Sequence, residues 1–201
     1  MLKPKKSLVR KHIEVLNDLK GYTIEAGFFE SARYRSVNGE PGPSVAYIAR
    51  INNDGATITI PAHTQTIINE FKIDRKGKII YKFVKHGKGK YAQKSVVVIP
   101  SHKVTIPARP FMTYAYELFV KGKSRFMKNL AERMFHENIP ADQALKDVAD
   151  YLEYCIIRSI KNGDWTPNAP STKARKGFDK PLIDKGTMWQ AVTSMIIKKG
   201  S

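Results

Sequence analysis

Histidine and cysteine are the side chains of this chain whose chemistry is easiest to recognise. No two of the five histidines form a metal-binding helical pair, and none lies beside a carboxylate cluster at the spacing of metal ligands. His63 and His102 follow similar proline-containing segments, and we interpret them as ordinary histidines at strand ends. Cys155 falls on the apolar stripe of a predicted helix, which favours a buried, unreactive thiol. The sequence therefore predicts no metal site, no cofactor and no cysteine nucleophile.

The acidic residues suggest no catalytic pair. Asp142, Asp147, Asp150 and Glu153 lie on one predicted helix, away from its apolar stripe, and are interpreted as its solvated face. A hydrolytic pair of carboxylates would need further acids brought in by the fold. We therefore predict that the protein is not an enzyme, and an enzyme is the third option after the two functions given below.

Net charge gives the clearest indication of partners. Lys and Arg total 35 against 18 Asp and Glu, which gives a formal charge of +17. Such a charge attracts polyanions such as nucleic acid, an anionic membrane or an acidic protein ring. The run HGKGK at residues 86–90 lacks the spacing of a phosphate-binding loop and is predicted to be a basic hairpin tip. The candidate contacts with DNA or an acidic partner are Lys85, His86, Lys88, Lys90, Lys173, Arg175 and Lys176.

Hydrophobic periodicity predicts the elements that would position these residues. Helices are expected over residues 7–19, 44–51, 111–136 and 141–162, with Ser44 as an N-cap and Gly122 as a possible kink. Strands are expected at 22–29 and 194–198, with a short helix capped by Asp184 or Thr187 before the last strand. Between them, short β-rich runs are expected at 57–60, 66–73, 78–84, 95–99 and 103–106.

These elements predict one α+β domain over residues 1–201, with helices packed on a mainly antiparallel sheet. The tetrapeptide TIPA occurs at 59–62 and again at 105–108, so it brackets a β-rich insertion predicted over residues 62–104. Breakers and basic residues predict an extended loop over residues 163–181.

The same sequence bears on the compartment and on membranes. The first residues are charged but no apolar segment follows them, so no secretory signal is expected. No apolar run approaches the roughly 20 residues that cross a bilayer, so no membrane partner is expected. A single cysteine excludes an intrachain disulfide and fits synthesis in a reducing cytoplasm.

Four segments in order carry a resemblance to a known family. Residues 44–55 (SVAYIARINNDG) are followed by 106–112 (IPARPFM), then by 160–172 (IKNGDWTPNAPST) and 176–188 (KGFDKPLIDKGTM). This order resembles the neck, tail-completion and virion-morphogenesis proteins of tailed bacteriophages, which include the minor-tail-protein-Z-like proteins. The likeness spans roughly residues 22 to 197. One departure is Lys185, which stands where the family usually has threonine.

The resemblance implies a small α+β subunit of a ring, expected to be sixfold, without catalysis or cofactor. The implied partners are copies of the chain, tail-terminator, tail-tube or head-completion proteins and packaged DNA. The implied location is the virion neck or upper tail, after assembly in the host bacterial cytoplasm. The predicted subunit contacts are Arg109, Phe111, Trp165, Pro170, Leu182, Met188 and Trp189, and packing within one chain is the alternative role of each.

Two functions therefore fit the sequence. One is a structural subunit that completes the tail and joins it to the DNA-filled head. The other is a basic protein that binds nucleic acid without sequence preference, since phosphate contacts need only Lys and Arg on one surface.

Overall fold

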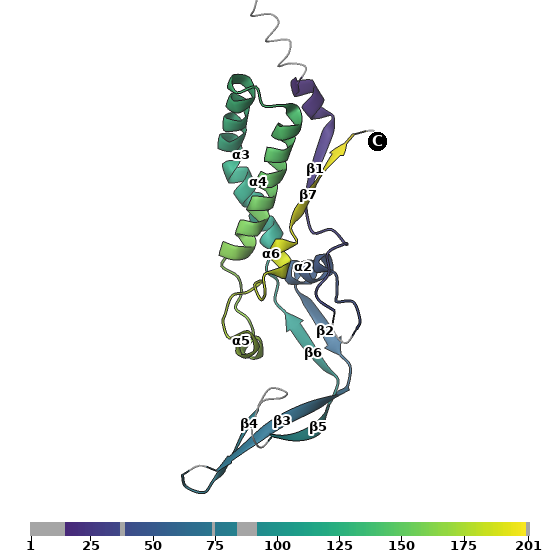
Figure 1. Cartoon of the computed structure of the whole chain (residues 1–201), viewed down its shortest axis with the longest axis vertical. Helices are drawn as coiled ribbons and strands as arrows, with labels where there is room; N and C mark the ends of the chain where they lie inside the picture. Colours follow the sequence, from purple (N-terminus) through teal and green to yellow (C-terminus); the bar gives the residue numbers. More distant parts are fainter. Residues whose placement is uncertain (1–14, 37–38, 74, 84–91, 200–201) are drawn as a thin grey trace, which may run out of the picture. The chain divides into compact units, whose positions relative to one another are not determined.

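The computed structural model describes residues 15–36, 39–73, 75–83 and 92–199 (Figure 1). The predicted α+β class is confirmed, because helices and antiparallel strands occupy different stretches of the chain. The strands of these described ranges form three small sheets rather than one. The chain divides into two compact units, residues 1–56 with 107–201 and residues 57–106.

A long helical hairpin dominates the first unit (Figure 1). It consists of α3 (Phe111–His136) and α4 (Ala141–Asn162), with the bounds that the periodicity predicts. Gly122 does not divide α3; a Cβ built there would lie 2.0 Å from the Tyr151 hydroxyl oxygen, so glycine makes room for α4. The Tyr151 ring in turn stacks on the Phe126 ring, with centroids 4.2 Å apart.

A two-stranded ribbon packs beside α4 and joins distant parts of the chain. It pairs β1 (Tyr22–Gly27) with β7 (Thr193–Lys198) in antiparallel register. Ser194 of β7 donates a hydrogen bond of 2.5 Å to the Glu153 carboxylate on α4. One face of the ribbon is thereby fixed against the hairpin.

Two short helices contribute to the core of the first unit, α2 (Val45–Asp54) and α6 (Thr187–Gln190). Ser44 caps α2 by accepting a hydrogen bond of 3.1 Å from the Tyr47 amide, as predicted. Side chains from α2, α3, α4 and the α6 region meet in the main core of this unit. Its buried members are Val45, Ala49, Phe111, Ala115, Ile156, Ile160, Met188 and Val192.

The described residues of the second unit form strands joined by turns, with no helix. One pair joins β2 to β6, and a three-stranded antiparallel sheet has the order β4-β3-β5. The predicted insertion, residues 62–104, lies within this unit, which also includes most of the flanking pair. The strand bounds are β2 Ala56–Ile60, β3 His63–Ile73, β4 Ile79–Phe83, β5 Ala92–Ile99 and β6 His102–Ile106.

Three predictions need correction or fall partly outside the described residues. The extended loop predicted over 163–181 is wrong in its middle, where Pro170–Lys176 forms helix α5. Proline at the first position and Gly177 in the left-handed region at the end fit that helix. Gly186, rather than Asp184 or Thr187, precedes α6. Residues 15–20 are helical, and the rest of the helix predicted at the N-terminus lies outside the described residues.

In the described part of the chain, no helix is both long and apolar enough to pass through a lipid bilayer.

Candidate assembly and partner-binding surfaces

Arg109 is a buried cation at the start of α3. Its side chain is 5% exposed, and its three guanidinium nitrogens donate to oxygens of the same chain. Nε donates to the Thr166 carbonyl at 2.9 Å, and one Nη donates to the Asn52 side-chain oxygen at 3.2 Å. The other Nη donates to the Pro167 carbonyl at 3.4 Å. Burial lowers the pKa of the guanidinium, which nevertheless stays charged because its ordinary pKa is so high.

The backbone around Arg109 joins the end of α2 to the start of α3. The Arg109 amide donates to the carbonyls of Asn52 and Asn53, which lie in the last turn of α2 and have no partner within that helix. In return, the Asn53 side-chain oxygen accepts from the Met112 amide at 3.0 Å, in the first turn of α3. Each helix therefore caps the other. The positive guanidinium also lies near the negative end of the α2 dipole.

Trp165 connects the segment after α4 to the same junction. Its indole N–H donates to the Ser159 carbonyl at 3.2 Å, and its ring meets the Tyr114 ring edge-on at 5.9 Å. A Cβ built on Gly163 would lie 2.2 Å from the indole, so this glycine allows the ring to fold back on α4. Ser159 is buried and donates to the Phe111 carbonyl at 2.6 Å.

The structure brings together most of the residues predicted as subunit contacts, inside one chain. Arg109, Phe111 and Met188 are buried, so the prediction that they contact a neighbouring subunit is corrected. Trp165, Leu182 and Trp189 are partly buried and pack against the same core. The Lys161 ammonium covers the Trp189 ring at 3.4 Å from its centroid. Pro170, which begins α5, is exposed and stays a candidate contact.

The predicted basic loop is neutralised in part by its own acids. Lys173 bonds to the Asp179 carboxylate at 2.5 Å, and Arg175 lies 3.5 Å from that of Asp184. Lys176 donates to the Lys180 carbonyl at 2.6 Å. The Lys173 hydrogen bond, helped by the Asn168 amide, lowers the pKa of the Asp179 carboxyl. These cations help to fold the loop, and they are less available to a polyanion than the sequence suggests.

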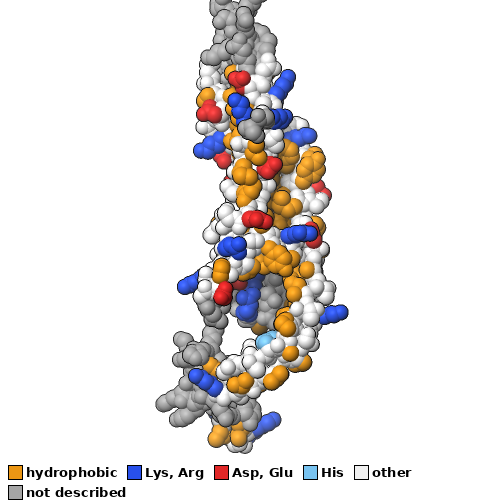
Figure 2. All heavy atoms as spheres, turned by 90° about the vertical axis from the view of Figure 1, so that its right-hand side faces the viewer, with side chains coloured by type: hydrophobic (Ala, Val, Ile, Leu, Met, Phe, Trp, Pro, Cys, Tyr) orange, Lys and Arg blue, Asp and Glu red, His pale blue; other side chains and the backbone are white. Residues whose placement is uncertain are grey.

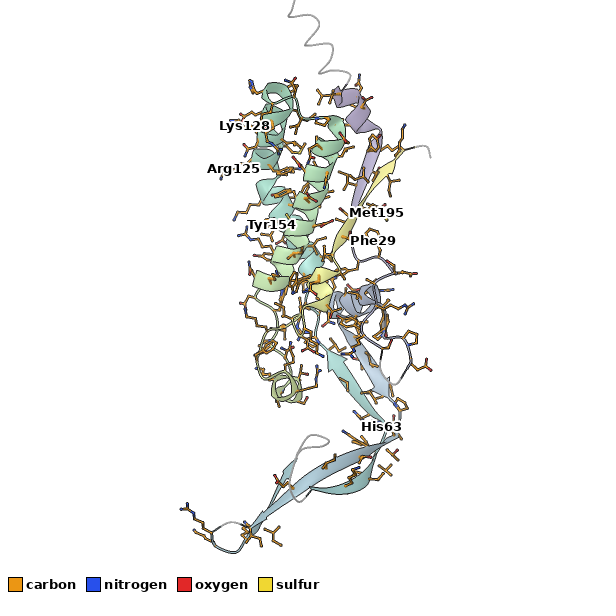
Figure 3. The ribbon with its side chains drawn as sticks, viewed as in Figure 1. Phe29, His63, Arg125, Lys128, Tyr154 and Met195 are labelled. Atoms are coloured by element: carbon orange, nitrogen blue, oxygen red, sulfur yellow. The ribbon has the colours of Figure 1, made fainter. Side chains whose placement is uncertain are left out.

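The other predicted basic contacts, Lys85, His86, Lys88 and Lys90, lie outside the described residues. A different basic surface is visible on α3. Lys121, Arg125 and Lys128 recur at helical spacing on one flank, and residues 118–131 include no acid. Within the described part of the chain, neither Lys121 nor Arg125 forms an ion pair, whereas Lys128 lies 3.9 Å from Glu132. Figure 3 shows Arg125 and Lys128 projecting from α3 on the side away from the β1–β7 ribbon.

An exposed aromatic side chain on α4 lies near this basic flank. Tyr154 is 50% exposed and stacks on Tyr151, which itself stacks on Phe126, the residue after Arg125. Arg158 donates to the Tyr154 hydroxyl at 3.0 Å. Cations beside an accessible aromatic ring are the combination that contacts phosphates and bases of nucleic acid.

Two of the histidines and the cysteine make contacts within their own chain. Nδ1 of His63 (Figure 3) and Nδ1 of His102 each donate at 3.0 Å to the carbonyl of the proline two residues before, Pro61 or Pro100. Cys155 is buried as predicted, and burial raises the pKa of its thiol. Over the described residues, no group of three or more His, Cys, Asp or Glu side chains is placed to hold a metal ion.

Apolar side chains remain exposed on the outer face of the ribbon. Because Ser194 contacts α4, strand alternation directs Met195 and Ile197 away from it. Both are accessible, at 42% and 38%, and Figure 3 shows Met195 pointing away from the hairpin. Figure 2 faces this side of the ribbon and shows hydrophobic side chains among charged ones.

Sequence reasoning did not identify the two asparagines as capping residues. The run Asn52-Asn53-Asp54-Gly55 predicts only a turn, because its partners lie more than fifty residues further along the chain. For the acids that pair with α5, the sequence contains a weak indication of the ion pairs, because Asp179 and Asp184 closely follow a cluster of cations.

Comparisons with protein-family models, with curated proteins and with solved structures find no match to this chain. The contacts above therefore carry the functional inference.

We predict that Arg109→Met lowers the free energy of unfolding of the first unit by about 3 kcal/mol, because three oxygens lose a charged donor. Arg109→Lys should restore only part of this loss, since one ammonium cannot replace the planar fork. Fluorescence-monitored denaturation measures the effect in this unit, which contains both tryptophans, Trp165 and Trp189. Arg35→Met, at an exposed arginine, is the matched control and should change stability by less than about 0.5 kcal/mol. Equal stability of Arg109→Met and wild type would contradict the assignment.

Proposed function

We propose that the protein is a structural subunit of a tailed-phage neck or tail-completion ring, which joins the tail to the DNA-filled head. The observation that carries this proposal is the meeting of the four family-like segments at one junction. Apolar residues from all four segments share one core: Val45 and Ala49 from the first, Phe111 from the second, Trp165 from the third, and Leu182 and Met188 from the fourth. Arg109, in the second segment, donates hydrogen bonds to the first and third segments.

This convergence gives the resemblance a physical meaning. Residues that are dispersed in the sequence but meet in one core define a fold, whereas an active site would require reactive groups that face a substrate. Arg109 and the Trp165 indole N–H donate to the chain's own oxygens. The functional work of such a chain then falls to its outer surfaces, as it does in an assembly subunit.

Exposed apolar side chains support the same proposal. Met195 and Ile197 on the ribbon, together with Val96 and Val98 of β5, are accessible in the single chain. Each of these two groups lies in a different unit, and exposed apolar groups are typical of interfaces between proteins. In a ring each copy would contact two neighbours, and tail-terminator, tail-tube or head-completion proteins would meet the remaining surfaces. The proposed location is the neck or upper tail of the virion, after assembly in the bacterial cytoplasm.

The mass of the purified full-length protein in solution tests this proposal. Light scattering across a range of concentrations, at low and high salt and without nucleic acid, should give one closed multiple of the 22.8 kDa chain. Virions that incorporate an epitope-tagged copy should bind antibody at the head–tail junction. A chain that is monomeric throughout, together with unlabelled virions, would overturn the proposal.

A second candidate function is nucleic-acid binding, favoured by the basic flank of α3. Lys121, Arg125 and Lys128 would contact phosphates, and Tyr154 lies within the same helical hairpin. Such contacts follow from charge and need no sequence recognition. In the ring this surface would meet packaged DNA, and in a monomer it would be the main activity.

Charge reversal on α3 tests the second candidate. Lys121→Glu with Arg125→Glu should weaken binding to duplex DNA and reduce the slope of log affinity against log salt by about 2. Lys180→Glu with Lys185→Glu changes the net charge equally at exposed positions of another segment and should have the smaller effect. Equal losses in the two variants would show that only net charge matters and would reject the α3 surface.

A further inference from the structure

The three-stranded sheet of the second unit exposes apolar side chains on both faces. In β5, Val96 and Val98 point to one face and are each 69% exposed, while Val97 points to the other and is 40% exposed. Within the second unit as described, there is no helix to cover either face. Three consecutive valines are typical of a strand that is buried on both sides.

The end of the edge strand β5 lacks charges, because residues 95–99 follow Lys94 and include no charged residue. Residues 55–69 are the longest stretch of the chain without Lys, Arg, Asp or Glu, and residues 95–102 are also free of them. The register places these stretches beside each other, with His63 opposite Ile99 and Thr66 opposite Val96. Among the described strands, β5 has a neighbour only on its β3 side.

The distribution of charge indicates which kind of partner could bind this surface. A polyanion would need cations, and residues 95–102 offer none. Two copies of a chain with a charge of +17 repel each other wherever their basic surfaces meet, so a contact between copies is least opposed where both are uncharged. An uncharged apolar segment with an unpaired edge, such as residues 95–99, is complementary to an apolar surface of a second copy.

We infer that the valine surface of β5, with its free edge, packs against a second copy of this chain. The inference rests on the proposed function and assigns the contact between copies to residues 95–99. Burial of Val96 and Val98 in that contact supplies apolar surface to the interface, and the unpaired β5 backbone supplies hydrogen bonds.

Lysine substitution tests the inference in the full-length protein. Val96→Lys with Val98→Lys should weaken self-association on the order of 100-fold, roughly tenfold for each valine that is no longer buried. Sedimentation equilibrium measures the change, and far-UV circular dichroism checks that the fold is kept. Tyr116→Lys, at a residue 67% exposed on α3, is the matched control and should leave self-association unchanged.

The results of this experiment distinguish a failure of the β5 contact from a failure of the proposed function. If wild type and the double variant associate equally, the β5 contact is wrong while the ring proposal stands. If wild type is monomeric at every concentration, the β5 contact is wrong, and the ring proposal is wrong as well if the virions also stay unlabelled.

A spin label provides a second test of the contact, which does not require the β5 strand to fold with lysine in place of valine. Cys155 is buried, so Val98→Cys supplies an accessible thiol for a nitroxide label. Mixing labelled protein with excess unlabelled wild type should immobilise the label on assembly, and a label at Tyr116→Cys should stay mobile. A mobile label at position 98 in the assembled protein would overturn the inference.

Discussion

The buried hydrogen bonds of Arg109 are the constraint on which the first unit depends. One guanidinium holds the carbonyls of Thr166 and Pro167 and the Asn52 side chain, while the Arg109 amide caps the end of α2. A buried cation is costly unless its donors are satisfied, so the segment after α4 must lie where these carbonyls meet it. This requirement positions the end of α2, the start of α3 and the segment after α4 relative to one another.

Fixing this junction also defines where the chain passes between its two units. The chain leaves the first unit just after α2 and returns just before Arg109, and the Arg109 amide ties these two points together. The β-rich unit is therefore an insertion in the first unit, whose own core is formed by residues on both sides of the insertion. The valines of β5 and the outer face of the ribbon are exposed, and we propose that they meet partners, whereas the cations of α5 are paired with groups of their own chain.

Local patterns in the sequence were enough to predict much of the fold. Apolar periodicity gave the bounds of α3 and α4, and Ser44 marked the start of α2, because these features depend on near neighbours. The pairing of β1 with β7 and the partners of Arg109 depend on contacts between distant segments, which one sequence does not encode locally. Helix α5 was predictable in principle, since Pro170 and Gly177 fit its two ends, but the same residues also indicate a loop.

The central claim is that each chain completes its core alone and completes its β surface only with other copies. Amide hydrogen exchange, measured by mass spectrometry on dilute monomer and on concentrated assembly, tests it most directly. We predict that amides around Arg109 and Met112 exchange slowly in both states, while the exchange of residues 95–99 slows markedly on assembly. Equal exchange of residues 95–99 in the two states, or exchange around Arg109 as fast as theirs in the monomer, would contradict the account.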